Sequence, residues 1–392
     1  MKIDNLKVTN FKSLKKLDVD LSNLTLLTGV NSTGKSSLIQ TILLLKQNQE
    51  ILKIVSNNKL LENLKVDGID EIQSQAYEKL IENGRNQSIT LNGEYLELGD
   101  KQDVLYQEAY DEDIIIELNV REFKYTVHCN SNDLKISIDS EMPLEALINL
   151  FSDDFQYIMT DRISPQITYP LSEYNIKKNL IGFKGEYSAH YLSENRHSKL
   201  NIIELKHPDS VTYQLMENVS LWLSEVSKGI EISANVYKEL QQVNLTYKYT
   251  YEDKTTNNYT PLNVGFGITY VLPIIVAILK AKSDDLLIIE NPESHLHPVG
   301  QSKIAELCAI ASANGVQIIV ETHSDHFLNG IRIATKKGLL LPKQSQIYYF
   351  RKEIGELETK IDKINIEKDG KVDNWPKGFF DEYSNQLDEL LW

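Results

Sequence analysis

Two short stretches of the sequence carry residue types that hold and cleave phosphate groups. The first is GVNSTGKS at 29–36, which fits the pattern GxxxxGK[ST] and lies between a strand-like run, 24–28, and a helix-like run. In that context backbone N–H groups and the helix N-terminus surround phosphates, the lysine reaches the β- and γ-phosphates, and the last hydroxyl binds Mg²⁺. The alternative is a Gly/Ser turn that precedes a helix by chance. We predict a nucleotide cradle made of Asn31, Ser32, Thr33, Gly34, Lys35, Ser36 and Ser37, with Ser36 on the metal.

The second stretch, LLIIENPESHLHP at 286–298, places an acid at the end of an apolar run. In P-loop enzymes the metal-binding acid ends a buried strand, so Glu290 is predicted to bind Mg²⁺; the alternative is a surface acid at a strand end. Another apolar run ends in ETHSDH. Its His323 should emerge at the same sheet edge, where open α/β folds keep their sites, and is predicted to sense the γ-phosphate unless it is merely structural.

The elements that position these residues follow from hydrophobic periodicity. Alternation predicts strands within 2–28 and 87–140, and helical spacing predicts a helix over 35–55. Apolar strands without alternation, at 285–290 and 315–321, are typical of a parallel sheet covered on both faces. The fold class is therefore α/β. Further helices are predicted at 70–83, 143–151, 210–230, 268–281 and 299–313, and exposed hairpins or loops at 248–263 and around Gly370.

Composition narrows the class of protein. The 392 residues are 41% hydrophobic, which is enough for a sizeable core, and the net charge of −15 argues against a surface coated in basic residues for nucleic acid. Cys129 and Cys308 show no paired spacing, as expected in a reducing compartment. The start lacks a signal-peptide core, and the apolar runs are too short to span a bilayer. We expect a soluble cytoplasmic protein that does not associate with membranes.

Four segments together resemble a known group of ATPases. They are LKVTNFKSLKKLDVDL at 6–21, GVNSTGKSS, LLIIENPESHLHP and ETHSDHFL. They resemble the ABC-type heads of the OLD, RecF and SMC-like group, and more narrowly compact bacterial AAA-family ATPases of the OLD-like type. The closing stretch with WPKGFFDE is similar to the short domain of unknown function at the tail of those proteins. The resemblance covers roughly 1–110 and 260–392.

This resemblance implies an ABC-type P-loop ATPase head with a mixed sheet and a parallel core. The sequence itself contains no heptad run long enough for an extended coiled coil. The resemblance also implies a division of the chain. We expect an N-terminal ATPase lobe at 1–142, a helical and loop insert at 143–258, a C-terminal ATPase lobe at 259–350 and a tail domain at 351–392.

The resemblance further implies a head-to-head homodimer that holds ATP and Mg²⁺ between its subunits. The segment NVGFGITYVLPII stands where the signature motif would contact the γ-phosphate held by the other subunit, and HLHP would cross the interface. Glycines before a helix also expose N–H groups to an anion, although a simple connecting loop is the alternative. His323 matches the switch histidine, and Arg162 matches a recurring arginine of unassigned role. The signature residues are Asn263, Gly265, Phe266, Gly267 and Thr269.

The position of the catalytic base departs from the family pattern. ABC ATPases carry two adjacent acids after this strand, but the second position here is Asn291, whose amide does not accept a proton as a carboxylate does. Glu293 is the candidate to replace it, with Glu290 and His323 completing the catalytic set. The alternative is that Glu293 only orders the loop and turnover is very slow; a base must reach its water.

No nuclease signature accompanies this site, and only 69 residues follow His323. We therefore expect an ATPase that gates a separately encoded nuclease or toxin, in anti-phage defence. The alternatives are DNA repair and a non-hydrolysing scaffold or sensor. His295 and His297 are weak grounds for zinc. DNA binding by a local basic region competes with an ordinary solvated face; that region contains Lys177, Lys178, Lys184, Arg196 and Lys199.

Overall fold

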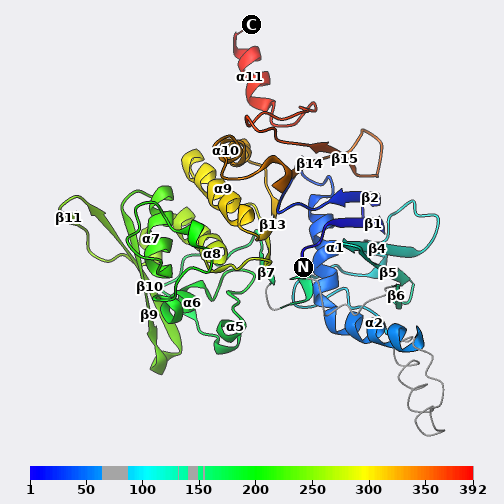
Figure 1. The fold of residues 1–392 in the computed structure, drawn as a ribbon, viewed down its shortest axis with the longest axis horizontal. Helices are drawn as coiled ribbons and strands as arrows, with labels where there is room; N and C mark the ends of the chain where they lie inside the picture. Colours follow the sequence, from blue (N-terminus) through cyan, green and yellow to red (C-terminus); the bar gives the residue numbers. More distant parts are fainter. Residues whose placement is uncertain (64–86, 131, 140–148, 153–154, 392) are drawn as a thin grey trace. The chain divides into compact units, whose positions relative to one another are not determined.

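The computed structural model describes residues 1–63, 87–130, 132–139, 149–152 and 155–391 (Figure 1). The chain forms two compact units, and each is built from segments that are separated in the sequence. Unit 1 contains Met1–Leu21, Val30–Ser152 and Phe350–Ile361. Unit 2 contains Ser22–Gly29, Asp153–Tyr349 and Asp362–Trp392. The polar helix predicted at 70–83 and most of that at 143–151 lie outside the described residues; the latter ends in a 3₁₀ turn, η2 (Asn149–Phe151).

Unit 1 is organised around an antiparallel sheet in the order β2-β1-β4-β5-β6. Alternate residues of β1, such as Leu6 and Val8, are buried, as the alternating sequence predicts. Leu6 pairs with Val19 on one side and Leu118 on the other, which fixes the register of the three strands. The elements are β1 (Asn5–Phe11), β2 (Leu14–Asp20), α1 (Lys35–Gln47), α2 (Gln49–Asn63), α4 (Lys101–Val104), β4 (Asp113–Val120), β5 (Phe123–Asn130) and β6 (Ile136–Asp139).

The helix predicted over 35–55 is interrupted at Asn48, between α1 and α2. The Asn48 backbone is not helical, with φ −100° and ψ 16°, and its side-chain amide donates to the Leu44 carbonyl at 2.9 Å. Such side-chain bonds compete with the helical ladder, which explains why helical spacing alone overestimated the length of the first helix.

The strands predicted at 88–99 were wrong. This segment makes only isolated bridges, because helix side chains take the place of a neighbouring strand. Gln47 Oε1 accepts from the N–H groups of Tyr95 and Leu96, at 3.1 and 3.0 Å. Asn48 Oδ1 accepts from the N–H of Thr90 at 2.8 Å. The backbone groups are therefore satisfied without a sheet partner.

Unit 2 contains the parallel sheet that the apolar runs predict. Its order is β15-β14-β3-β13-β12-β7, and β3, β13, β12 and β7 are mutually parallel. In register, Glu290 at the end of β12 lies beside Glu321 at the end of β13. The strands are β3 (Leu24–Gly29), β7 (Phe155–Ile158), β12 (Leu286–Glu290), β13 (Gln317–Glu321), β14 (Ser345–Arg351) and β15 (Lys360–Ile364), of which the end of β14 and the start of β15 are counted with unit 1.

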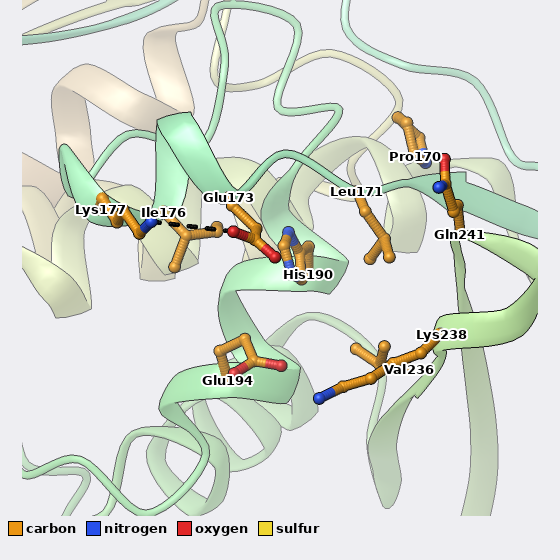
Figure 2. Close-up of a pocket in the computed structure, with 10 residues that line it drawn as sticks. All are labelled: Pro170, Leu171, Glu173, Ile176, Lys177, His190, Glu194, Val236, Lys238 and Gln241. Carbon is orange, nitrogen blue, oxygen red and sulfur yellow. Dashed lines mark ion pairs between the residues drawn. The ribbon is translucent and has the colours of Figure 1, made fainter.

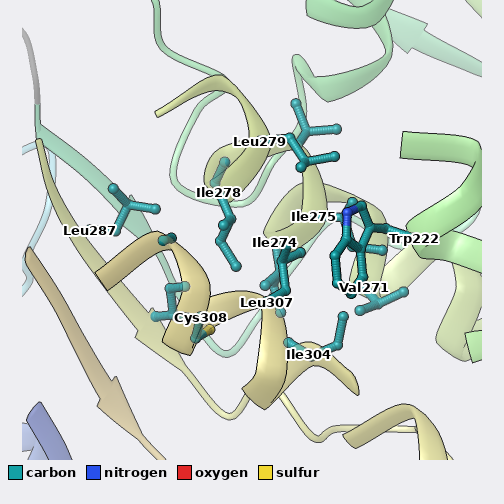
Figure 3. Close-up of a cluster of buried hydrophobic side chains, with 14 of the residues drawn as sticks. Trp222, Val271, Ile274, Ile275, Ile278, Leu279, Leu287, Ile304, Leu307 and Cys308 are labelled. Carbon is teal, nitrogen blue, oxygen red and sulfur yellow. The ribbon is translucent and has the colours of Figure 1, made fainter. Parts of the chain in front are cut away.

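The core of unit 2 lies where α7, α8 and α9 meet this sheet (Figure 3). Trp222 of α7, Ile275 of α8 and Leu307 of α9 all belong to the same buried cluster. Because α8 is apolar on every side, it is buried along almost its whole length. The helices are α5 (Glu173–Lys177), α6 (Ser188–Asn195), α7 (Leu215–Val226), α8 (Phe266–Lys280), α9 (Pro298–Ala313), α10 (Asp325–Lys336) and α11 (Glu382–Leu391).

A second, antiparallel sheet in unit 2 lies within the segment predicted as an insert. Strand β10 pairs with β9 along eight residue pairs and with β8 at its start. The predicted exposed hairpin at 248–263 is present, because β11 folds back onto the end of β10. The strands are β8 (Thr168–Pro170), β9 (Ile230–Tyr237), β10 (Gln242–Tyr251) and β11 (Lys254–Thr255), and the 3₁₀ turns of unit 2 are η3 (Ile203–Leu205), η4 (Lys238–Leu240), η5 (Pro261–Asn263) and η6 (Pro342–Gln344).

The tail after β15 is anchored on α10. The hairpin predicted around Gly370 forms, with Glu367 N–H donating to the Lys371 carbonyl at 2.7 Å. Arg332 Nε of α10 donates to the Gly370 carbonyl at 2.8 Å, and its guanidinium lies 5.8 Å from the centre of the Trp375 ring. Phe379 is fully buried against Tyr349. The aromatic residues of WPKGFFDE thus attach the tail to unit 2.

Candidate functional site

The P-loop in unit 1 has the backbone that its sequence predicts. Gly34 adopts φ 103°, a left-handed conformation that favours glycine, and forms the N-cap of α1. Gly34 has no side chain, so the oxygen with which Ser, Thr or Asp usually caps a helix is absent from the N-cap position. A thirteen-residue helix therefore begins at a loop shaped for an anion.

Lys35 is folded under the loop. Its side chain is 3% exposed, and Nζ donates to the Val30 carbonyl at 2.8 Å. The Thr33 hydroxyl donates to the same oxygen at 2.7 Å. Both bonds close the loop on itself, while Ser36 at the start of α1 is exposed. The residue types and their placement fit a bound nucleotide phosphate with its metal.

Thr359, a residue far from the P-loop in the sequence, contacts the backbone of this loop. Thr359, also in unit 1 and 4% exposed, has its Oγ1 2.8 Å from the Thr33 carbonyl oxygen and 2.8 Å from Ser13 Oγ. The Thr359 N–H donates to the Ser13 carbonyl at 2.8 Å. A Cβ on Gly34 would overlap Thr359 Oγ1, so this glycine is also required for close packing.

In unit 2, the end of the neighbouring strand β7 holds the Glu290 carboxylate. Oε1 accepts from the Tyr157 hydroxyl at 3.0 Å, and Oε2 accepts from the Thr160 N–H at 3.1 Å and lies 2.9 Å from Thr160 Oγ1. The pKa of Tyr157 is raised, mainly by burial and also by the nearby Glu290 charge, so the phenol keeps its proton and remains a donor. Glu290 is thus oriented at the strand edge, where α/β folds bind ligands.

Arg162 clamps the backbone that follows β12. Its Nη1 donates to the Glu290 carbonyl at 2.7 Å and its Nη2 to the Asn291 carbonyl at 2.8 Å. The guanidinium lies 4.3 Å from the centre of the Tyr270 ring. Burial lowers the pKa of Arg162 to about 10, which leaves it protonated at neutral pH. The arginine of unassigned role therefore fixes the direction of the loop that carries both candidate acids.

Asn291 occupies the position of the missing base and has a structural role. Its backbone is left-handed, with φ 44°, and its N–H donates to the Glu321 carbonyl at 2.8 Å. Its side-chain Oδ1 lies 2.8 Å from Thr160 Oγ1. An asparagine tolerates this backbone better than most residues, so the amide fits a sharp turn that begins directly after β12.

Glu293 bridges the loops that follow β12 and β13. Its Oε2 accepts from the Thr322 hydroxyl at 2.8 Å, and its Oε1 accepts from the His323 N–H at 2.7 Å. Since each carboxylate oxygen has two lone pairs, one acceptor position remains on each. The structure thus brings Glu293 and His323 together, with the His323 side chain exposed.

The signature segment packs against the HLHP segment of the same chain. Gly265 is the N-cap of α8, and a Cβ on Gly267 would overlap the His295 carbonyl oxygen. The His295 ring lies 4.7 Å from that of Phe266 and 5.0 Å from that of Tyr270, edge to face in both cases. Phe266 is 43% exposed. These two segments therefore form one joint surface; Asn263 ends the turn η5 before it, and Thr269 is buried in the first turns of α8.

The two histidines of HLHP have different surroundings. The His295 ring packs among the aromatic side chains described above, whereas His297 is the N-cap of α9, with Nδ1 accepting from the Val299 N–H at 3.5 Å. Within the described ranges, no group of three or more His, Cys, Asp or Glu side chains is arranged to hold a metal ion.

The basic residues of the middle region are largely engaged. Lys184 pairs with Asp161 at 2.8 Å, and Lys177 lies 3.8 Å from Glu173. Arg196 Nη2 donates to the Ala234 carbonyl at 2.8 Å. These bonds favour a solvated or structural surface over a basic groove for DNA.

No helix in the part of the chain that the structure describes is long and apolar enough to cross a bilayer.

A cavity of about 710 Å³ lies between α5, α6 and the β9–β10 sheet (Figure 2). His190 is 5% exposed, and its Nδ1 accepts from the Ser172 N–H at 3.1 Å. Two glutamates and two lysines line the cavity, so their charges cancel and the lining favours neither an anionic nor a cationic ligand. The lining residues are Pro170, Leu171, Glu173, Ile176, Lys177, His190, Glu194, Val236, Lys238 and Gln241.

Comparison with known families agrees with this geometry. Residues 24–329 match the family described as "AAA domain, putative AbiEii toxin, Type IV TA system", which is more than half of the chain. The chain belongs to this family of AAA-domain proteins, in line with the resemblance to AAA-family ATPases in the sequence. Residues 340–390 match a second family, a protein of unknown function designated DUF3696. No protein of curated function matches the sequence.

One solved structure confirms the fold class, and two further matches are reported beside it. An SMC head bound to the C-terminal winged-helix domain of ScpA has a TM-score of 0.52 and 14% identity, covering 94% of this chain and 99% of that one. The SMC head domain from Thermotoga maritima has a TM-score of 0.43 and 11% identity, and the match covers 94% of this chain and 100% of that one. A third structure is the Pyrococcus furiosus Smc head with an extended coiled coil, bound to the C-terminal domain of ScpA. Its TM-score is 0.46 and its identity is 11%, and the match covers 100% of both chains. The first match shows that the chain has the fold of an SMC head; within the described residues it has no long coiled coil.

Several residues of the site escaped the sequence analysis. Tyr157, Thr160 and Tyr270 surround the Glu290 loop, and Thr359 supports the P-loop. Tyr270 lies within the signature segment, but the resemblance assigned it no role, and the other three belong to no motif with a recognisable spacing. The signal that pointed to this region was the family match of Arg162, four residues after the last residue of β7 and close in sequence to Tyr157 and Thr160.

Proposed function

We propose that this chain binds and hydrolyses ATP with Mg²⁺, as the ATP-driven subunit of a system with a separate effector. The observation that carries this proposal is the P-loop, in which left-handed Gly34, without a capping side chain, precedes α1 and Lys35 is buried; these residues are the proposed phosphate cradle. Bound Mg²⁺ would neutralise phosphate charge and polarise the phosphoryl group. Ser36 and Glu290 are the proposed metal-binding residues, with Glu290 already oriented by Tyr157 and Thr160.

The proposed nucleotide contacts include residues on both sides of Gly34, Lys35 and Ser36. Asn31, Ser32 and Thr33 precede Gly34, and Ser37 follows Ser36. Their N–H groups, rather than their side chains, would surround the phosphates. His323 would sense the γ-phosphate, and the hydrogen bond from its N–H to Glu293 would set the direction of its backbone.

Nucleotide binding and phosphate release by purified variants test this proposal. Lys35→Ala is expected to abolish ATP binding, whereas Lys15→Ala, an exposed lysine of β2 in the same unit, should bind ATP normally. Glu290→Gln should retain ATP binding and lose Mg²⁺-dependent phosphate release. Equal ATP binding by the wild type and Lys35→Ala would remove the cradle from the mechanism.

Glu293 is the proposed carboxylate that replaces the base missing at Asn291. A glutamine fits its two bonds, because its oxygen still accepts from the His323 N–H and its amide donates to the Thr322 hydroxyl oxygen. Glu293→Gln should therefore fold normally, and a collapse of turnover would report on the lost carboxylate. Glu204→Gln, an exposed acid of the same unit, is the matched control.

The second candidate function is a non-hydrolysing ATP sensor. It is favoured by Asn291 and by the two structural bonds of Glu293, which together leave the usual base position without a carboxylate. In that case ATP and a non-hydrolysable analogue would drive the same assembly, and Glu293→Gln would leave the slow phosphate release unchanged. Turnover that requires Glu293 excludes this alternative.

We further propose an ATP-dependent homodimer that gates a nuclease or toxin in bacterial anti-phage defence. The exposed Phe266 and the HLHP loop form the joint surface that a second copy would meet. The toxin and type IV description of the family supports a defence system. Light scattering should show an ATP- and Mg²⁺-dependent monomer-to-dimer shift that Lys35→Ala loses. A dimer insensitive to nucleotide counts against gating by closure.

A further inference from the structure

The segment that joins β14 to β15 contributes a support for the nucleotide cradle. It belongs to unit 1 together with the P-loop, and it lies inside the 340–390 match to the family of unknown function. Within this segment Thr359 is 4% exposed and bonds to both Ser13 and Thr33. Its neighbours are held by ion pairs, since Lys360 lies 3.3 Å from Glu353 and 2.7 Å from Glu356.

The direction of the hydrogen bonds follows from counting protons. The Thr33 carbonyl only accepts, so Thr359 uses its single hydroxyl proton on that oxygen, 2.8 Å away. The Ser13 hydroxyl, 2.8 Å from Thr359 Oγ1, is then the donor to Thr359. The result is a two-hydroxyl relay that ends on the P-loop backbone.

This relay affects the orientation of the Gly34 N–H, which belongs to the proposed phosphate-binding loop. In a trans peptide the C=O and the following N–H point in opposite directions. A bond that fixes the Thr33 carbonyl therefore also fixes the Gly34 N–H, which is directed away from Thr359. P-loop N–H groups of this kind form the phosphate cradle. Rotation of the Thr33–Gly34 peptide would turn the carbonyl oxygen, and not the N–H, towards the anion.

We propose that Thr359 is a positioning residue for the nucleotide cradle: its hydroxyl holds the Thr33–Gly34 peptide with the Gly34 N–H turned towards the phosphates. This inference rests on the proposed function, because it assigns a role within the same cradle. It also gives the segment of unknown function a task, which is to complete the P-loop from a distant part of the chain.

The test compares Thr359→Val with Thr359→Ser in the full-length protein. Valine keeps the shape and removes the hydroxyl, whereas serine keeps the hydroxyl. Titration with a fluorescent ADP analogue should show binding about fivefold weaker for Thr359→Val, as expected for one lost hydrogen bond, and nearly unchanged for Thr359→Ser. In steady state the KM for ATP should rise more than kcat falls. Equal affinities for the wild type and Thr359→Val would overturn the proposal.

A second measurement is independent of nucleotide. Amide hydrogen exchange of the peptide covering 30–37 in the nucleotide-free protein should be faster in Thr359→Val and unchanged in Thr359→Ser. Equal exchange in the wild type and in Thr359→Val overturns the positioning role. If the wild type binds no nucleotide, the proposed function fails, while the exchange rates still decide whether Thr359 orders the loop. Ser13→Ala, which removes the donor to Thr359, should give a smaller increase and serves if Thr359→Val does not fold.

Discussion

Gly267 lies against the His295 carbonyl oxygen so closely that no side chain fits between them. This packing holds the start of α8 against the loop that follows β12. Gly267→Ala should therefore force the two segments apart and lower the free energy of unfolding by about 1–3 kcal/mol, the usual cost of overpacking. Gly265→Ala is the matched control, because its Cβ would meet only Ile268 Cδ1 at 3.8 Å. Chemical denaturation of both variants is the measurement, and equal stability would contradict the prediction.

Arg162 should be irreplaceable by lysine. Its two nitrogens serve the Glu290 and Asn291 carbonyls at once, while its plane covers Tyr270. A lysine has no planar fork, so at least one buried carbonyl would lose its donor. We expect Arg162→Lys to lower the free energy of unfolding by about 2–3 kcal/mol and to reduce phosphate release further than ATP binding. Arg121→Lys, at an exposed position, should change neither, and a fully active Arg162→Lys would contradict the clamp.

The two cysteines should resist thiol reagents until the fold opens. Cys129 and Cys308 are 2% and 0% exposed, and burial raises the pKa of each thiol to about 12. The native protein at pH 8 should therefore react slowly with an aromatic disulfide reagent, and rapidly in denaturant. Because each folded pKa lies above the ordinary value of about 8.5, both thiols add stability below pH 8.5 that is lost as the pH rises towards 12. Rapid native labelling at pH 8 would argue against this burial.

Removal of Arg332 should loosen the tail without unfolding the ATPase core. The residue donates to the Gly370 carbonyl and lies over the Trp375 ring. Arg332→Ala should raise hydrogen exchange over 364–381 and lower the stability of this segment by about 1–2 kcal/mol. Arg332→Lys keeps the cation over the ring and should show a smaller change. Unchanged exchange in Arg332→Ala would show that the aromatic packing of Phe379 anchors the tail alone.

The sequence was sufficient where one local pattern determines the outcome. The P-loop, the buried strands that end at Glu290 and Glu321, and helix α8 follow from motif and periodicity alone. Prediction failed where side chains replaced expected backbone partners, as when Gln47 and Asn48 bonded the segment at 88–99. The proposed roles of Glu293 and His323, and the four-part division of the chain, stay predictions.

Long-range contacts were the other limit. Thr160 meets Glu290 across 130 positions, and Thr359 meets Thr33 across 326. Neither residue type is unusual, and neither spacing repeats, so no periodic pattern marks them. Arg162 was recognised only by resemblance, and its task became visible when the two carbonyls that it binds were located.

The interleaving of the two units has a consequence for synthesis on the ribosome. Unit 1 contains Met1–Leu21 and also Phe350–Ile361, so a nascent chain cannot complete it before Asp153–Tyr349 of unit 2 has been translated. The P-loop itself emerges long before Thr359, which bonds its backbone. Units that close late in translation expose their unfinished surfaces for longer, which is when chaperones bind. The P-loop thus acquires its bond to Thr359 only after most of unit 2 has been made.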